Sequence, residues 1–154
     1  LAGALAPADV VLSTVVAKAA VPVAEQAAAH LRPTQLYIDL NSAAPGTKRR
    51  VAEVLQASGC GVIDGAILSP VPKHRHKVPI LLCGPRVAEA TATLSALGFN
   101  VENGGETLGA ASATKMQRSS TQRSSPTSAT TNTSSVWRTS SPKTPTPENG
   151  ARVT

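Results

Sequence analysis

Hydrophobic residues follow two alternating patterns along residues 8–102 of the chain. Short runs rich in valine, isoleucine and leucine are separated by longer stretches in which apolar residues recur at helical spacing. A short continuous apolar run predicts a strand that is buried on both faces of a sheet, whereas helical spacing predicts a helix with one buried face. The runs predict strands at 8–15, 35–40, 61–68, 79–84 and 99–102.

Helices are expected between these strands, and prolines and glycines mark their ends. Pro22 and Pro45 are compatible with helices because the first helical turn tolerates proline. Gly59 and Gly98 each close a stretch of helical spacing, where glycine readily adopts the left-handed conformation that ends a helix. The expected helices are 17–31, 45–58 and 86–97, with a further helix at 109–118.

The repeated alternation of strand and helix, with short connections, is typical of an α/β fold. We therefore expect a mostly parallel sheet with right-handed crossovers and flanking helices. In such sheets, ligands bind at the carboxyl ends of the strands. The residues at those ends are Thr14 and Val15, Asn41 and Ser42, and Leu68 and Ser69.

The pattern changes at Ser119. From there to Thr154 the chain is dominated by serine, threonine, proline and arginine, and Val136 and Trp137 stand nearly alone as large apolar residues. Such a segment cannot bury enough apolar surface to offset the entropy lost on ordering. We expect residues 1–118 to fold and residues 119–154 to form a disordered tail.

The composition fits a small aliphatic core. Hydrophobic residues make up 41% of the chain but aromatic residues only 2%, so the core must be built from valine, leucine, isoleucine and alanine. Cys60 and Cys83 are too few for a disulfide framework and lie in apolar segments, which indicates buried thiols in a reducing, cytoplasmic compartment. No apolar run approaches the roughly 20 residues that span a bilayer, so no membrane association is expected.

The net charge of +6 raises the question of an anionic partner. Much of that charge lies in the C-terminal stretch without interleaved aromatic residues, which disfavours nucleic-acid binding. The basic segment 73–77 contains His74 and His76, but no cysteine or carboxylate accompanies them to complete a metal site. We expect a solvent-facing basic loop and no bound metal, with contact to an anionic substrate or phosphate as the alternative.

Several segments carry recognisable motifs in a consistent order. Residues 39–45 read Asp-Leu-Asn-Ser-Ala-Ala-Pro, similar to the pattern Asp-x-Ser-Thr-x-x-Pro, and residues 109–116 resemble a Gly-x-x-x-x-x-Lys segment with its lysine at Lys115. Together with the strand at 8–15 and the Val-Ile-Asp-Gly-Ala sequence at 62–66, they resemble the β-hydroxyacid dehydrogenase family. This family includes the 3-hydroxyisobutyrate and 6-phosphogluconate dehydrogenases, and the resemblance covers most of the foldable chain.

The resemblance implies an NAD(P)-dependent oxidoreductase with an incomplete Rossmann-type sheet. Residues 1–118 would form the later part of the dinucleotide-binding domain and the start of the interdomain helix. Lys115 would be the catalytic lysine. A lysine with a lowered pKa can accept the hydroxyl proton of a substrate while hydride leaves for nicotinamide, and can return it in the reverse reaction. Without the resemblance, the residues alone favour a surface lysine on an ordinary helix.

The same resemblance implies the cofactor contacts. Asn41 and Ser42 would lie beside the nicotinamide ribose of NADP or NAD, with N-capping of the helix that starts at Pro45 as the alternative role. Thr14 and Val15 would touch the cofactor mainly through their backbone. The residue that distinguishes NAD from NADP is not recognised in this chain.

The substrate implied by the resemblance is a small hydroxy acid, with Ser69 and Ser119 at the substrate positions. The family usually carries Ser-Gly-Gly in the substrate loop, where backbone N–H groups hold the carboxylate. Here the corresponding positions are Leu68, Ser69 and Pro70. Pro70 has no N–H to donate, so the carboxylate must be held differently.

One family motif is not found. No Gly-x-Gly-x-x-Gly sequence follows a predicted strand, so we expect a gene fragment or frameshift product that binds NAD(H) or NADP(H) poorly and turns over nothing by itself. Full-length relatives that continue into a helical domain are expected to be homodimers. A different interpretation is a non-enzymatic α/β domain whose basic tail binds an anionic partner.

Overall fold

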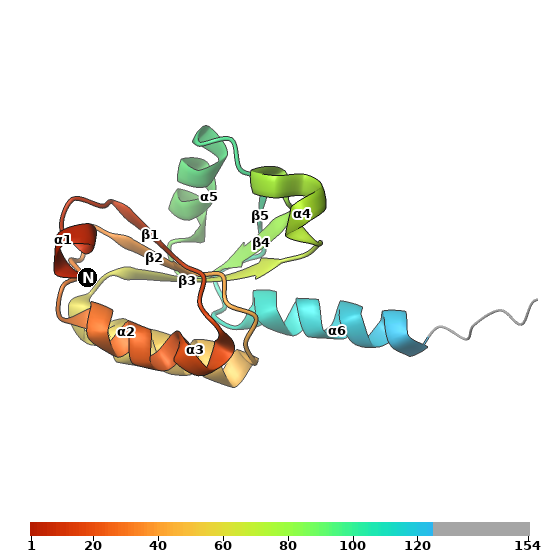
Figure 1. The fold of residues 1–154 in the computed structure, drawn as a ribbon, viewed down its shortest axis with the longest axis horizontal. Helices are drawn as coiled ribbons and strands as arrows, with labels where there is room; N and C mark the ends of the chain where they lie inside the picture. The colour runs from red at the N-terminus through yellow and green to blue at the C-terminus, as the bar shows by residue number, and fades with distance from the viewer. Residues whose placement is uncertain (125–154) are drawn as a thin grey trace, which may run out of the picture.

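The computed structural model describes residues 1–124, and within this range the strands form one five-stranded sheet (Figure 1). The order of the strands across the sheet is the same as their order along the chain. The expected α/β fold, with a mostly parallel sheet and flanking helices, is confirmed. The strands are β1 (Val10–Ser13), β2 (Leu36–Asp39), β3 (Gly61–Ile67), β4 (Ile80–Cys83) and β5 (Val101–Asn103).

One strand pair departs from the expected parallel arrangement. β1, β2 and β3 are parallel, as are β4 and β5, but β3 and β4 pair antiparallel. The connection between β3 and β4 contains only two short turns of helix, α4 (Val71–His74) and the 3₁₀ turn η3 (Arg75–Lys77). Neither is long enough to cross a face of the sheet, so the chain returns along the neighbouring position in the opposite direction. The segment expected as a basic loop is therefore partly helical.

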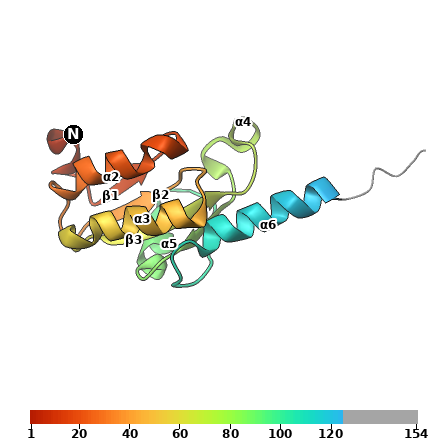
Figure 2. The same ribbon diagram turned by 90° about the horizontal axis from the view of Figure 1, so that it is seen from below.

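Helices cover both faces of the sheet. Figures 1 and 2 show α2 and α3 side by side on one face and α5 on the other, while α6 starts beside the sheet and extends away from it. α6 contacts β3, β4 and α3. The helices are α1 (Ala2–Leu5), α2 (Ala20–Ala28), α3 (Pro45–Leu55), α5 (Val87–Ala96) and α6 (Ala110–Ser124), with 3₁₀ turns η1 (Ala17–Ala19) and η2 (Gln56–Ser58).

The alternation of side chains along β2 divides the core between the two faces. Leu36 and Ile38 pack with Val87 and Leu94 of α5, whereas Tyr37 lies among residues of α2 and α3. A strand buried on both faces needs apolar residues at consecutive positions, which explains why β2 reads as a continuous run rather than an alternating one. The continuous run is therefore the signature of a central strand.

The predicted helix ends largely agree with the structure. Pro22 lies in the first turn of α2. Gly59 directly follows η2 and Gly98 lies two residues beyond the end of α5, and they adopt positive φ angles of 69° and 83°. The end of α6 differs, because the helix continues to Ser124 instead of stopping before Ser119. The remainder of the expected tail, residues 125–154, lies outside the described residues.

Cys60 and Cys83 are free and buried, as expected, and burial raises the pKa of both thiols. Among residues 1–124, no helix combines the length and the apolar character needed to cross a membrane.

Candidate functional site

Polar side chains are gathered where β1, β2 and β3 end. The strand register aligns Ser13 with Asp39 and Asp39 with Asp64, so the three residues form one row across the sheet. Residues aligned in this way point to the same face, here the face covered by α3 and α6. All three are buried, and both carboxylates are at most 2% exposed. Two buried carboxylates side by side require a compensating positive charge.

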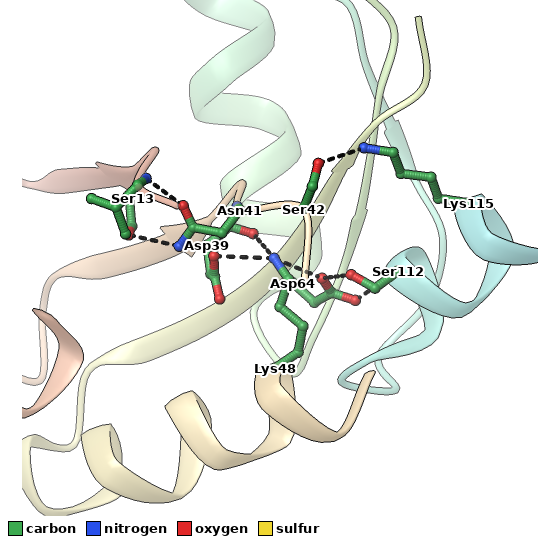
Figure 3. A network of polar contacts seen from close by, with 9 residues as sticks. Ser13, Asp39, Asn41, Ser42, Lys48, Asp64, Ser112 and Lys115 are labelled. Atoms are coloured by element: carbon green, nitrogen blue, oxygen red, sulfur yellow. Dashed lines mark hydrogen bonds and ion pairs between the residues drawn. The ribbon is translucent and has the colours of Figure 1, made fainter. Parts of the chain in front are cut away.

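Lys48 supplies that charge from α3. Its ammonium lies 3.1 Å from Asp39 Oδ1 and 3.4 Å from Asp64 Oδ1, and it donates a hydrogen bond of 2.6 Å to the backbone carbonyl of Asp39 (Figure 3). α3 begins at Pro45, after an extended backbone at Ala44, in the segment that follows β2. Lys48 therefore lies in the first turn of the helix. We refer to Asp39, Lys48 and Asp64 as the ionic cluster.

The ionic cluster also holds the start of α6. The backbone N–H of Ser112 donates to Asp64 Oδ2 at 3.0 Å, and the Ser112 hydroxyl donates to Asp64 Oδ1 at 2.8 Å (Figure 3). The first N–H groups of a helix have no partner within the helix, and carboxylates are favoured there. Asp64 therefore accepts hydrogen bonds from α6 while it neutralises Lys48 of α3.

Asn41 ties the ends of β1 and β2 together. Its backbone N–H donates to Asp39 Oδ1 at 2.9 Å, its amide donates to Ser13 Oγ at 3.1 Å, and its amide oxygen accepts the backbone N–H of Val15 (Figure 3). Asn41 is 4% exposed. A buried asparagine with its groups satisfied in this way sets the path of both connecting segments.

Asn41→Ala is expected to release the segment after β1. The backbone N–H of Val15 loses its acceptor, which should lower the free energy of unfolding by about 2 kcal/mol. Hydrogen exchange should show faster exchange at Val15, together with a lower thermal midpoint. Asn103→Ala is the matched control, because Asn103 Oδ1 also accepts a backbone N–H, that of Gly105, but at an exposed site. Equal losses in both variants would contradict this role of Asn41.

Lys115 lies one turn beyond Ser112 on α6, and its ammonium donates a hydrogen bond of 2.9 Å to Ser42 Oγ (Figure 3). Two pockets meet at this pair. The first has a volume of about 440 Å³ and is lined by Asn41, Ser42, Ala43, Ala44, Ala66, Ser112, Lys115, Met116, Ser119 and Ser120. The second has a volume of about 380 Å³ and is lined by Ser42, Ile67, Leu68, Ser69, Pro70, Val71 and Lys115.

The surroundings of Lys115 favour its neutral form. Partial burial lowers the pKa of the Lys115 ammonium, and repulsion from the Lys48 ammonium lowers this pKa further. Its pKa therefore lies below that of an ordinary lysine, and a larger fraction of the amine is free at neutral pH. A free amine beside two pockets can accept a proton from a bound hydroxyl group.

The structure brings most of the sequence-predicted site residues together. Asn41, Ser42, Lys115 and Ser119 line the first pocket, and Ser69 lines the second with Ser42 and Lys115. The Ser119 hydroxyl donates to the Lys115 carbonyl at 3.0 Å, so in this arrangement it bonds to its own helix.

Thr14 and Val15 lie outside these two linings. The Thr14 side chain is exposed, and the Val15 backbone N–H is already bound to Asn41. A backbone contact to a ligand at Val15 would therefore have to use its carbonyl or displace Asn41.

The sequence analysis missed Lys48, Asp64 and Ser112. A signal for Lys48 was present, since it shares the buried face of α3 with Val51 and Leu55 at helical spacing. A lysine in the apolar stripe of a helix indicates a buried cation that needs a carboxylate partner. Asp64 stood in an otherwise apolar strand and was the complementary signal.

A third hollow, of about 490 Å³, lies around the start of β3 and includes Cys60, Gly61 and Arg86 in its lining. Arg86 is already engaged there, since it donates to Glu89 at 2.6 Å and to the Pro33 carbonyl at 2.9 Å. Burial raises the pKa of the Cys60 thiol and keeps it protonated. The hollow is therefore a weaker candidate than the two pockets beside Lys115, although it is somewhat larger.

Comparison with known proteins identifies relatives among solved structures, whereas no family model and no curated protein matches the chain. A conserved hypothetical protein from Sinorhizobium meliloti 1021 is 45% identical, with a TM-score of 0.74, over 77% of this chain and 40% of its own. The conserved protein MTH1747, of unknown function and described as structurally similar to 3-hydroxyacid dehydrogenases, is 32% identical, with a TM-score of 0.69, over 75% of this chain and 43% of its own.

An imine reductase from Myxococcus stipitatus, solved as a variant in complex with NAD⁺, shares the fold with a TM-score of 0.66 at 20% identity, over 79% of this chain and 44% of its own. This chain thus spans about two fifths of the length of these relatives. The similarity to a protein described as resembling 3-hydroxyacid dehydrogenases, and the fold shared with an NAD⁺-bound imine reductase, agree with the resemblance that the motifs around Ser42 and Lys115 indicated.

Proposed function

We propose that this chain forms the nicotinamide side of an NAD(P)-dependent oxidoreductase site in which Lys115 is the general acid and base. The observation that carries the proposal is the hydrogen bond of 2.9 Å between Lys115 and Ser42 at the junction of two pockets. These pockets lie at the carboxyl ends of parallel strands, where α/β sheets bind ligands. The proposed reaction converts a hydroxy acid into its oxo form.

The donor groups around the first pocket fit a nicotinamide riboside. Its volume of about 440 Å³ suits a small ligand rather than a whole dinucleotide. Ser42 accepts a hydrogen bond from Lys115, which leaves the Ser42 hydroxyl proton available for a ribose or carboxamide oxygen. The similar imine reductase was solved with NAD⁺, which supports a nicotinamide dinucleotide as the ligand class. When bound, this cofactor supplies the hydride acceptor or donor.

Lys115 would handle the proton. As a free amine it accepts the hydroxyl proton of the substrate while the carbon-bound hydride departs, and as an ammonium it returns the proton to the carbonyl oxygen in the reverse direction. Partial burial and the nearby Lys48 ammonium lower the pKa of Lys115, which favours the free amine needed for oxidation. Ser42 would orient the Lys115 ammonium between the two pockets.

The second pocket is the proposed substrate position. Ser69 contributes a hydroxyl group to its lining. Lys115 and Ser42, which also line the first pocket, form the side that the two pockets share. Pro70 offers no backbone N–H, so a substrate carboxylate would bind through side-chain hydroxyls such as that of Ser69. Ser119 lines the first pocket and not the second, so it would contact the substrate only where the substrate extends past Lys115, and only after its hydroxyl has left the helix carbonyl.

The proposal is tested with reduced nicotinamide mononucleotide, a probe that carries the nicotinamide half of the cofactor. In the 154-residue chain it should shift the backbone NMR signals of Asn41, Ser42 and Lys115, with a dissociation constant of about 1 mM or weaker. Ser42→Ala should weaken these shifts. Lys73→Ala, in the exposed basic segment, should leave them unchanged.

Two results would contradict the proposal. If the probe leaves the signals around Ser42 and Lys115 unchanged at about 10 mM, the pockets do not hold a nicotinamide. If the shifts are confined to residues 73–77, the phosphate of the probe is bound by the basic segment instead, which is the phosphate contact expected as the alternative role of that segment.

A further inference from the structure

We propose that Lys48 is a positioning residue for Lys115: through Asp39 and Asp64 it holds the first turn of α6 and so places the Lys115 ammonium beside Ser42. The proposal extends the function proposed for Lys115 to a residue from another helix. It rests on the geometry of the ionic cluster, which can be tested without nicotinamide or hydroxy acid.

The contacts of the Lys48 ammonium fix its position beside the carboxylates of Asp39 and Asp64. Its ammonium has three protons and three oxygen partners within 3.4 Å, namely the two carboxylates and the Asp39 carbonyl. The Lys48 side chain is 1% exposed. Water therefore cannot replace its contacts, and the position of the ammonium is determined by the ends of β2 and β3.

Asp64 transmits that position to α6. One of its oxygens contacts Lys48 and accepts the Ser112 hydroxyl, while the other accepts the Ser112 backbone N–H. Ser112 and Lys115 are three residues apart on α6 and therefore lie on neighbouring positions of one helix face. Fixing Ser112 sets the rotation of the helix, and this rotation decides whether Lys115 reaches Ser42.

Apolar contacts alone would hold the start of α6 weakly. The buried residue that α6 contributes to the core here is Ala111, which packs with Ala66, Leu81 and Cys83. A methyl group offers little area for burial, so the two hydrogen bonds from Ser112 to Asp64 carry much of the attachment. The attachment of α6 therefore depends on a charged Asp64 carboxylate. Lys48 stabilises this buried charge through its ion pair with Asp64.

Lys48 also acts on Lys115 through space. The charged groups that face Lys115 are Lys48 from α3 and, behind it, Asp39 from β2 and Asp64 from β3; Arg118, on the next turn of α6, is exposed. Lys48 is the cation whose repulsion lowers the pKa of Lys115, after the larger effect of burial. Removing the Lys48 charge should therefore raise the pKa of Lys115.

The test uses two variants that remove this charge. Lys48→Met combined with Asp64→Asn conserves the net charge of the ionic cluster, since two carboxylates and one ammonium sum to −1 and Asp39 alone is also −1. The Asp64→Asn substitution keeps a side-chain oxygen as acceptor for Ser112. Lys48→Gln is the second variant and retains an amide that can donate to the carboxylates. Amide fingerprint spectra establish that each variant is folded.

Two NMR readouts in the 154-residue chain distinguish positioning from simple packing. The carbon-13 shift of Lys115 Cε, followed from about pH 7 to 11, reports its pKa, which should rise by about 0.5 or more in Lys48→Gln and by less in the double variant, where the Asp64 charge is removed as well. The nuclear Overhauser effect between the Lys115 side chain and the Ser42 β protons reports position. It should be lost in the double variant and partly retained in Lys48→Gln.

The control removes an exposed ion pair from the same helix. Arg50→Met with Glu53→Gln deletes a contact of 3.0 Å whose side chains are 61% exposed, and it should leave both readouts unchanged. A folded Lys48 variant with an unchanged Lys115 pKa and an unchanged contact to Ser42 would overturn the proposal. Failure of the nicotinamide probe to bind would not affect these readouts, so the two proposals can fail separately.

Discussion

Replacing Lys48 by methionine is expected to lower the free energy of unfolding by about 3–5 kcal/mol, the largest loss we expect from a single side chain in this protein. Methionine has a similar length and fills the space, but it leaves Asp39 and Asp64 buried side by side without a cation. Either the two carboxylates repel each other or one takes up a proton, and both outcomes cost free energy. Urea unfolding followed by circular dichroism measures the loss.

The location of the charge, rather than the loss of an ion pair, should decide the size of this effect. Arg50→Met removes an ion pair on the exposed side of the same helix and should cost about 0.5 kcal/mol or less. Adding Asp64→Asn to Lys48→Met should restore part of the lost stability, with a coupling energy of about 1–3 kcal/mol in a double-mutant cycle. If Lys48→Met is as stable as Arg50→Met, the ionic cluster does not need its cation.

Gly84→Ala should cost about 3 kcal/mol or more. Gly84 follows β4 and has a φ angle of 150°, a conformation that only glycine adopts readily. A Cβ atom there would lie 2.7 Å from the Val62 backbone carbonyl and 3.1 Å from Ile63 Cδ1. The backbone of the central strand β3 cannot move aside without disturbing its pairing with β2 and β4, so the variant has to distort the sheet.

Gly98→Ala separates the two causes of this loss. Gly98 also has a positive φ angle, 83°, but no atom lies within 4 Å of the position that its Cβ would take. It should lose about 1 kcal/mol from backbone strain alone. Thermal unfolding of the two variants side by side measures the difference. Similar losses in both would show that the contact with β3 is relieved at little cost.

Local sequence determined the elements of this fold. Continuous apolar runs specified the buried strands, because a strand covered on both faces needs apolar residues at every position. Gly59 and Gly98 marked helix ends because both positions require positive φ angles. The motif around Lys115 identified the candidate acid and base, and its order relative to Ser42 indicated the resemblance to β-hydroxyacid dehydrogenases.

Some features depended on contacts between distant segments. The direction of β4 follows from how the short turns at 71–77 dock, because a connection of this length can in principle lead to either a parallel or an antiparallel neighbour. The tail composition suggested a helix end at Ser119, yet α6 extends to Ser124. Individual propensities do not report where a helix anchored at its start will stop.

The assembly of the site shows the same division. Sequence alone named Asn41, Ser42 and Lys115 through their motifs, but it could not show that Lys115 reaches Ser42 across 73 residues of chain. Only the tertiary structure brought Lys48 of α3 between two carboxylates of the sheet and joined Asp64 to α6. The physical reason is that the charge of a buried group depends on partners far away in sequence, whereas strand, helix and turn preferences are properties of neighbouring residues.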